Sequence, residues 1–420
     1  MVRKMKDSGV EWIGEIPEDW EVKRLQWGLS EIVIKNDPIQ TENILSLTKD
    51  RGVIPYKDKG NQGNKSKTDC KDYKLAYPDT IVMNSMNVII GSVGICDYFG
   101  CVSPVYYVYK ARENYDLRFF NYIFQIPKFQ DELKKYANGI LEIRLRVSSE
   151  NVLKRQVAIP KYELQKKISD VLDKKSMEID SIELYINQEI ETLEAYKKSV
   201  ITEAVTKGLD KSAEMKDSGI EYIGEKPINW DIKKVKYLIT ERIIRSMDGK
   251  GELLSVSQYK GVIPSSKNSM RTAQARSLIG YKVVKKGDLV FNKLNPELAR
   301  FSVSEYDGIT SPDYAVYIVN RSQVLEKFLE YVLKTDRYAT EYGRVTLGVG
   351  DGFKRLYTNQ LGCFFITCPS IEEQEEILSY LKKKTQAIDE VIAIKQNQLS
   401  VLDEYKKSLI YEYVTGKREV

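Results

Sequence analysis

The chain of 420 residues contains one sequence pattern twice, and this internal repeat constrains the fold more than any other feature. The segment MKDSGVEWIGEIPEDWEVKRL begins at Met5, and MKDSGIEYIGEKPINWDIKKV begins at Met215, 210 residues later. Further matches, such as LSLTKDRGVIP from Leu45 with LSVSQYKGVIP from Leu254, keep an offset of 208 to 210 residues. Solenoid repeats have much shorter periods. The chain is therefore predicted to contain two copies of one complete folding unit.

Each copy begins with a region in which strand and helix patterns are interspersed. Short β-branched and aromatic runs, such as YAVYIV at 314–319 and CFFIT at 363–367, are bounded by Gly, Pro, Asn and Asp and predict strands. Residues 117–137 and 325–343 carry helical patterns between such runs. We therefore expect an α+β domain in each copy.

Each copy ends in a long helical pattern, which runs in the first copy from Gln165 to about Thr206 without Pro or Gly. Apolar residues spaced by seven predict a coiled-coil seam. Its proposed members are Leu172, Ile179, Ile186 and Leu193 in the first helix, and Leu381, Ile388, Leu402 and Leu409 in the second. A second seven-spaced row lies four residues earlier and includes polar residues such as Lys175 and Glu189, which could set the register or lie exposed at the edge.

Two helices with one apolar stripe each most simply pack on each other, and the domain between them in the chain permits an antiparallel pair. The alternative is that each helix packs only within its own half. We predict two similar globular domains separated by two long antiparallel coiled-coil helices, with a pseudo-twofold internal repeat. The predicted order is a domain at 1–162, a helix at 163–208, a domain at 209–372 and a helix at 373–420.

The positive charge is concentrated in the predicted domains. Residues 1–162 hold 25 basic and 21 acidic residues (+4), and residues 209–372 hold 25 and 20 (+5). The helix at 163–208 holds 7 and 10 (−3), and the helix at 373–420 holds 8 and 9 (−1). Basic domains suit a polyanionic partner, and the Ser, Thr, Asn and Gln of their loops suit contacts with phosphates and base edges. A solvated loop is the alternative interpretation of each lysine-rich segment.

Basic side chains at matching places in the two copies are the candidate nucleic-acid contacts. Residues 253–287 contain no acid, and residues 57–74 hold six lysines against three aspartates. Arg146 and Arg355 occupy equivalent positions beside glycine-rich turns, where each could reach a groove, cap a helix or pair with a carboxylate. Asn84 and Asn292 are also equivalent, and either a structural role or base reading fits them. The basic candidates are Lys57, Lys59, Lys65, Lys67, Lys71, Arg146, Lys267, Arg271, Arg276, Lys285, Lys286, Lys293 and Arg355.

Several catalytic classes find no support in the sequence. The chain has no histidine, so His-based triads are excluded, and it has no G-x-x-x-x-G-K-[ST] motif for ATP. Glu21-x-Lys23 and Asp231-x-Lys233 superficially suit a nuclease half-site, but no acid is evident to pair with them. The five cysteines lack C-x-x-C spacing, which favours buried reduced thiols over zinc ligands or disulfides. No apolar run approaches the roughly 20 residues of a membrane span, and we expect a cytoplasmic protein.

Several segments of the chain together resemble a known family. They are the repeated MKDSGVEWIGEIPEDW, GDLVFNKLN at 287–295, GITSPDYAVY at 308–317 and LGVGDGFKRL at 347–356. SIEEQEEI at 370–377 and AYKKSVITEAVTKG at 195–208 complete the likeness, which covers essentially the whole chain. The family is that of the specificity subunits of type I restriction-modification enzymes. First-copy segments such as SPVYYVY depart from the second copy, so the resemblance predicts two domains that read different DNA sequences.

The resemblance implies that each domain reads one half of a split, asymmetric site in double-stranded DNA, with the helices setting the spacing. It also implies a subunit with no catalytic residues, metal or cofactor of its own. Methylation with S-adenosylmethionine would come from modification subunits, two of them, and ATP- and Mg²⁺-dependent cleavage would come from restriction subunits. The competing hypotheses are an enzyme with its own site, and a coiled-coil scaffold whose basic loops bind protein or RNA.

Overall fold

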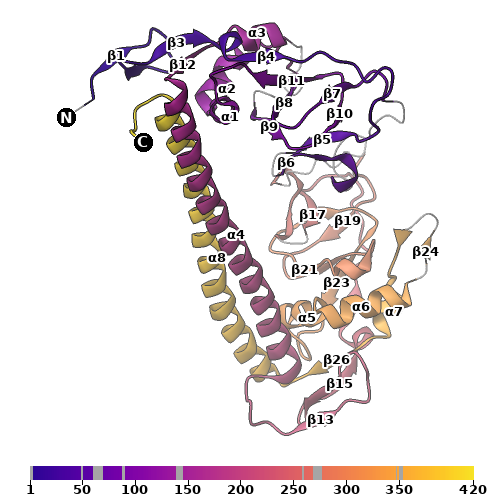
Figure 1. Cartoon of the computed structure of the whole chain (residues 1–420). Coiled ribbons are helices and arrows are strands. Elements are labelled where there is room, and N and C mark those ends of the chain that lie inside the picture. The colour runs from indigo at the N-terminus through magenta and orange to yellow at the C-terminus, as the bar shows by residue number, and fades with distance from the viewer. Residues whose placement is uncertain are drawn as a thin grey trace. The chain divides into compact units, whose positions relative to one another are not determined.

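The computed structural model describes residues 3–48, 51–59, 70–87, 90–138, 145–257, 260–267, 277–346, 348–349 and 353–420. The chain forms two compact units, one of Met1–Asn187 with Gln396–Val420 and the other of Gln188–Lys395. Along the chain, a β-rich region precedes the long helix α4 (Tyr162–Lys207), and a second β-rich region precedes the long helix α8 (Ile371–Val414) (Figure 1). Each unit therefore contains one β-rich domain and parts of both helices.

A four-stranded antiparallel sheet in the order β4-β11-β8-β9 organises the first domain. Its strands are β4 (Leu29–Glu31), β11 (Tyr106–Ala111), β8 (Thr80–Asn84) and β9 (Val93–Cys96). Every residue of β8 is buried, as expected of a strand with a neighbour on each side and packing on both faces. The helices α1 (Leu117–Phe124) and α2 (Pro127–Lys134) contribute aromatic side chains, including Phe119 and Phe129, to the same core.

Among the described residues of the first domain, four strand pairs and a short helix accompany this sheet. The short helix α3 (Ser149–Leu153) begins at the N-cap Ser148, whose side chain accepts a hydrogen bond from the backbone N–H of Asn151. The antiparallel pairs are β1 (Met5–Asp7) with β2 (Glu15–Pro17), β3 (Glu21–Arg24) with β12 (Gln156–Ile159), β5 (Leu45–Thr48) with β6 (Gly52–Pro55), and β7 (Lys74–Ala76) with β10 (Gly100–Val102). The β3–β12 pair brings the start and the end of the domain together immediately before α4.

The second domain repeats this plan. Its central sheet has the order β16-β23-β20-β21, with the strands Ile239–Glu241, Tyr314–Val319, Leu289–Asn292 and Phe301–Val303. A second sheet, β18-β17-β22-β19, contains Gly261–Pro264, Leu253–Ser257, Gly308–Thr310 and Lys282–Val284. The remaining pairs are β13 (Met215–Asp217) with β14 (Glu225–Pro227), β15 (Asp231–Lys234) with β26 (Phe365–Cys368), and β24 (Gly348–Val349) with β25 (Phe353–Lys354). The helices are α5 (Glu326–Leu333), α6 (Asp336–Val345) and α7 (Thr358–Gly362).

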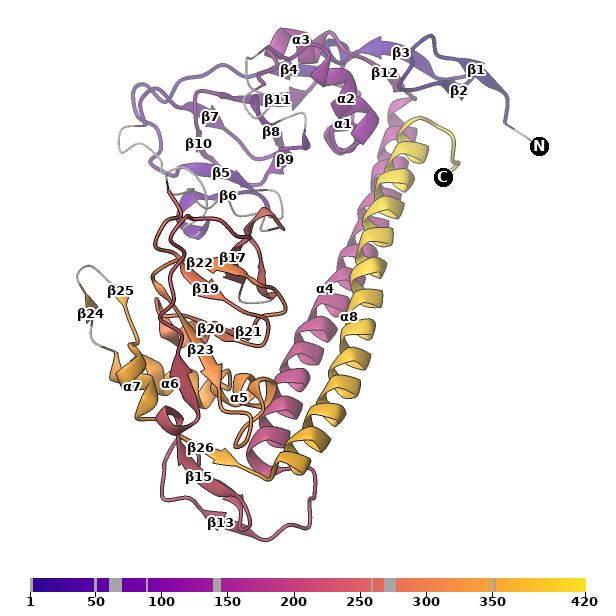
Figure 2. The ribbon, with the colours of Figure 1, turned by 180° about the vertical axis from the view of Figure 1, so that it is seen from behind.

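The two long helices run antiparallel within each unit. In the first unit, Lys406 of α8 donates to Asp180 of α4, and the start of α4 shares a core with the end of α8. In the second unit, Lys197 Nζ of α4 lies 2.6 Å from Asp389 Oδ1 of α8. These two ion pairs are equivalent under the repeat with the roles of the helices exchanged. The views from opposite sides agree that the helices lie side by side (Figure 2).

The seam between the helices is closed along one row of side chains. Leu172, Ile179, Leu381 and Leu409 are buried, as are Ile186 and Ile388, whereas Leu193 and Leu402 are half-buried. The second predicted row is buried only where each helix begins. Farther along this row Ile182, Tyr196, Val391 and Tyr405 are each more than 40% exposed. An exposed outer row beside a buried inner row is the pattern of a two-helix layer that is covered on one face.

The structure confirms the predicted fold class. Both β-rich domains are of the α+β kind, each is followed by a long helix, and the equivalent strands keep the sequence offset of the repeat. Within the described residues, none of the helices has the length and apolar character that a bilayer span requires.

Candidate nucleic-acid interface

The first lysine-rich segment begins at the short 3-10 helix Tyr56–Asp58, directly after strand β6. Lys57 is exposed and has no ion-pair partner among the described residues, and Lys59 Nζ lies 5.5 Å from the centre of the Tyr56 ring. Lys71 lies exposed in the turn before β7. Lys65 and Lys67 lie outside the described residues. The described members of this segment present positive charge beside strands β6 and β7.

In the second lysine-rich segment, Lys267 ends the 3-10 helix Ser265–Lys267, whereas Arg271 and Arg276 lie outside the described residues. Lys285 and Lys286 occupy the turn between β19 and β20, and both have acidic neighbours. Lys285 Nζ lies 3.1 Å from Asp307 Oδ2, and Lys286 Nζ lies 3.7 Å from Glu305 Oε2. This turn is therefore charge-balanced, although residues 253–287 contain no acid.

A buried polar cluster lies where the strands of the second domain meet. Lys282 Nζ at the start of β19 is 2.8 Å from Glu241 Oε1 at the end of β16, and the Lys282 side chain is only 7% exposed. Thr358 donates its hydroxyl hydrogen to the other oxygen of Glu241. Burial alone would raise the pKa of Glu241, but the hydrogen bonds from Lys282 and Thr358 leave it below the usual value.

The first domain contains the same cluster at equivalent positions. Lys74 Nζ lies 3.5 Å from Glu31 Oε1, and the hydroxyl groups of Tyr109 and Ser149 are 2.9 Å apart, as those of Tyr317 and Thr358 are in the second domain at 3.1 Å. Burial raises the pKa of both tyrosines, so their hydroxyl groups keep their protons. No local sequence pattern marks these residues as a cluster, although each equivalent pair shares the offset of the repeat.

Lys293 and Arg355, both predicted contacts, lie close together beside this cluster. The backbone N–H of Leu356 donates to the carbonyl oxygen of Lys293 at 3.1 Å, and Arg355 Nη2 lies 2.9 Å from Asp313 Oδ1. Burial lowers the pKa of Lys293, and the nearby positive charge of Lys282 lowers it further. Three cations therefore lie close together with the carboxylates of Glu241 and Asp313. Such an arrangement can hold a guanidinium in a fixed orientation.

The equivalent arginine of the first domain has different surroundings. Arg146 is exposed, its backbone pairs with that of Asn138, and its side chain has no ion-pair partner among the described residues. Val105 occupies the position that corresponds to Asp313, so the first domain has no acid there. The two domains thus present different side chains on a common framework.

Asn84 and Asn292 have a shared structural role. Each is buried at the end of its strand, and its side-chain oxygen accepts a hydrogen bond from the backbone N–H two residues later, in Met86 and Leu294 respectively. This is an Asx-turn, which ends the strand and directs the chain into the next loop.

The residues considered for nuclease chemistry are in ordinary surroundings. Glu21 forms an ion pair with Lys23 on strand β3. Within the described residues, no group of three or more Cys, Asp or Glu side chains could hold a metal ion. Four cysteines are buried and Cys363 is exposed, and all five are free thiols. Burial raises the pKa of Cys96 to about 11 and that of Cys368 to about 12.

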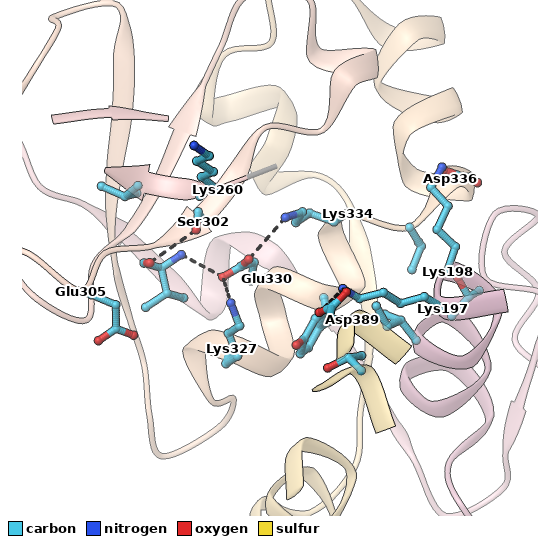
Figure 3. Close-up of a pocket in the computed structure, with 18 residues that line it drawn as sticks. Lys197, Lys198, Lys260, Ser302, Glu305, Lys327, Glu330, Lys334, Asp336 and Asp389 are labelled. Carbon is cyan, nitrogen blue, oxygen red and sulfur yellow. Dashed lines mark hydrogen bonds and ion pairs between the residues drawn. The ribbon is translucent and has the colours of Figure 1, made fainter. Parts of the chain in front are cut away.

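A cavity of about 470 Å³ lies in the second unit between α5, strands β18 and β21, and the two long helices (Figure 3). Several of the charged side chains that line it form ion pairs with one another. Lys327 and Lys334 both lie beside the buried carboxylate of Glu330, which also accepts a hydrogen bond from the backbone N–H of Val303 at 2.9 Å. Lys197 pairs with Asp389 on the helix side.

Known proteins similar to this chain are specificity subunits of type I restriction enzymes. Residues 17–192 match the type I restriction modification DNA specificity domain. The putative type I restriction enzyme MjaX specificity subunit of Methanocaldococcus jannaschii is 25% identical over 442 residues, covering 97% of this chain and 96% of that protein. The type I restriction enzyme MjaVIII specificity subunit of the same organism is 24% identical over 437 residues, covering 96% of this chain and 94% of that protein.

A solved structure has a similar fold. A chain from a study of complex assembly and conformational transition in a type I restriction-modification system superposes with a TM-score of 0.68 at 13% identity, covering 96% of this chain and 99% of that chain. At this identity the likeness concerns the fold alone. With the duplicated α+β architecture, the matching domain and the full-length relatives, the chain is similar to the specificity subunits of type I restriction-modification systems.

Proposed function

We propose that this chain reads a bipartite, asymmetric site in double-stranded DNA, with one domain for each half-site and with α4 and α8 setting the spacing between them. The observation that carries the proposal is the repetition of the whole recognition unit. Each copy has the same four-stranded sheet order and the same cluster of Glu, Lys, Tyr and a hydroxyl side chain, and each is joined to its own long helix.

The difference between the domains supports an asymmetric site. Equivalent arginines, Arg146 and Arg355, differ in that only Arg355 has an aspartate beside it among the described residues. An arginine held in a fixed orientation can form two hydrogen bonds with a guanine, and a single changed side chain at a base edge shifts the preferred base. Two domains with different side chains at this position would therefore read different half-sites.

Phosphate contact is the role we propose for the lysines of the two lysine-rich segments. Lys57, Lys59 and Lys71 lie near strands β6 and β7 of the first domain, and Lys267 lies just after β18 in the second. Lys285 and Lys286 are weaker candidates because Asp307 and Glu305 offset their charge. Lysine–phosphate contacts supply affinity that falls steeply with salt, whereas base-edge contacts supply sequence preference.

We assign catalysis to partner subunits. The chain would bind two modification subunits, which carry S-adenosylmethionine, and restriction subunits, which use ATP and Mg²⁺, and it would hold no cofactor itself. The exposed outer row of the helices, which includes Ile182 and Val391, offers apolar area for such partners.

Methylation mapping tests the proposal. The modification subunits should methylate adenines at one split sequence when this chain is present, and should show no sequence preference without it. Methylation or cleavage by the isolated chain would favour the enzyme hypothesis, and a complex without sequence preference would favour the scaffold hypothesis. Inserting one heptad at matched positions of α4 and α8 should change the preferred spacer and leave both half-sites unchanged.

A further inference from the structure

A buried glutamine stands at the start of each long helix and joins three parts of its own domain. Gln165 in α4 and Gln374 in α8 are 1% and 0% exposed. Their positions, 209 residues apart, are equivalent under the repeat. A buried amide that forms several hydrogen bonds fixes the geometry of the groups around it.

The hydrogen bonds of the first glutamine connect the last strand, the long helix and the helix α1. Gln165 Nε2 donates to the carbonyl oxygen of Pro160, just after β12, at 2.9 Å. Gln165 Oε1 accepts from the backbone N–H of Asp116, the N-cap residue of α1, at 3.0 Å. The side chain of one residue in the first turn of α4 therefore sets both the strand-to-helix turn and the position of α1.

The second glutamine makes the corresponding set of hydrogen bonds. Gln374 Nε2 donates to the carbonyl oxygens of Pro369 at 3.0 Å and Gln323 at 3.3 Å. Gln374 Oε1 accepts from the backbone N–H of Leu325, the N-cap residue of α5, at 2.8 Å. The amide of Gln374 thus both donates and accepts hydrogen bonds. Its partners are backbone groups just before α8 and at the start of α5.

The first domain has additional ties to its helix that the second lacks. Arg118 in α1 pairs with Asp170 and Asp173 of α4 at 2.9 and 2.7 Å, and Tyr122 donates to Asp173 at 2.6 Å. In the second domain, no side chain of α5 forms an ion pair or a hydrogen bond with α8 among the described residues, and the cavity of Figure 3 lies between α5 and the helices. Trp230 Nε1 of this domain donates a single hydrogen bond to Glu373 Oε1 of α8, at 2.9 Å. Gln374 therefore carries a larger share of the polar attachment of its domain than Gln165 does.

We propose that Gln165 and Gln374 are positioning residues that fix the direction of each domain relative to its spacer helix, and so determine which half-site spacing the subunit accepts. This inference rests on the proposed function. A domain that turns about the start of its helix moves its far end most, and a displacement of about 3.4 Å equals one base-pair step of DNA. Loss of the amide at either position should thus admit spacers that differ from the native one by a base pair.

The test uses the full chain in complex with its modification subunits, and methylation of a DNA series in which both half-sites are fixed and the spacer changes by single base pairs. In Gln374→Met, which keeps the length of the side chain without the amide, the preference for the native spacer over its neighbours should fall about tenfold, which corresponds to 1.4 kcal/mol. In Gln165→Met the preference for the native spacer should fall less, because the contacts of Arg118 and Tyr122 with α4 remain. The bases required within each half-site should stay the same.

Two further variants separate positioning from general destabilisation. Gln374→Glu keeps the acceptor for Leu325 but turns its second carboxylate oxygen toward the carbonyl oxygens of Pro369 and Gln323, so its preference for the native spacer should fall at least as far as that of Gln374→Met. Val256→Ala shortens a buried side chain in the smaller core of the same domain, away from the junction, and should keep the native spacer preference. An unchanged spacer preference in Gln374→Met, or an equal loss in Val256→Ala, would overturn the inference. A wild-type complex that methylates no split site would instead overturn the proposed function.

Discussion

The ion pair between Lys282 and Glu241 offers a direct measure of how strongly the polar cluster stabilises the second domain. We consider Lys282→Met, which preserves the aliphatic stem and removes the charge. Lys282 is 7% exposed and Glu241 is 25% exposed in their side chains, with 2.8 Å between the charged atoms. Removing one partner of a fully buried pair costs about 3–5 kcal/mol. Because Glu241 is a quarter exposed and keeps the hydrogen bond from Thr358, we expect Lys282→Met to lower the free energy of local opening by about 2 kcal/mol. This corresponds to roughly a 30-fold increase in the population of the locally open state.

Hydrogen-exchange mass spectrometry of the peptides that cover β19 and β22 measures this opening without requiring the whole chain to unfold in one step. The double variant Lys282→Met with Glu241→Gln should recover much of the loss, because no charge is then left buried without its partner. The matched control is Lys285→Met, whose partner Asp307 lies at a similar 3.1 Å but in an exposed pair, and it should destabilise the domain far less than Lys282→Met does.

The effect of Lys282→Met should also depend on pH. The folded-state pKa of Glu241 is lowered, so its stabilising contribution is present above the unfolded value of about 4.3 and is lost as the pH falls through the folded value. The difference in stability between wild type and Lys282→Met should therefore be largest at neutral pH and should become smaller in acid. A cost below about 0.5 kcal/mol at neutral pH, or a cost that does not change with acid, would refute the stabilising role.

Three further outcomes follow from the burial and pairing of particular side chains. Leu172→Ala, in the fully buried part of the seam, should lower the free energy of unfolding by about 2–5 kcal/mol, whereas Lys197→Ala, at a partly exposed ion pair, should cost at most about 1 kcal/mol, as measured by urea denaturation with circular dichroism. Arg355→Ala should change the methylated sequence in one half-site only, and altered bases in both half-sites on methylation mapping would contradict this assignment. Cys363 should react with iodoacetamide at mildly alkaline pH well before Cys101, whose pKa burial raises to about 12, and peptide mass spectrometry would show the order.

Local patterns in the sequence were sufficient to predict the long helices and the duplication. The sequence placed the first helix at 163–208, and the structure has it at Tyr162–Lys207. Helical periodicity and the absence of Pro and Gly act over neighbouring residues, so they can be read without knowing the fold. The offset of 208 to 210 residues likewise implied equal folds, and the two central sheets have the same strand order.

The candidate site was predicted less completely, because charge along the sequence does not show which charges meet. Residues 253–287 lack acids, yet Lys285 and Lys286 face Asp307 and Glu305 across the turn. Lys282 lies in the same acid-free range, yet it is buried against Glu241, 41 residues away in the chain. Such pairs depend on which strands become neighbours.

The sequence by itself thus determined the duplicated architecture and the placement of basic charge in the domains. The tertiary structure alone decided which cations are offset by carboxylates, which row of the helices is buried, and how Gln165 and Gln374 tie each domain to its helix. The physical reason is that secondary structure follows from interactions between near neighbours in the chain. Ion pairing, burial and the direction of a domain instead arise from residues that only folding brings together.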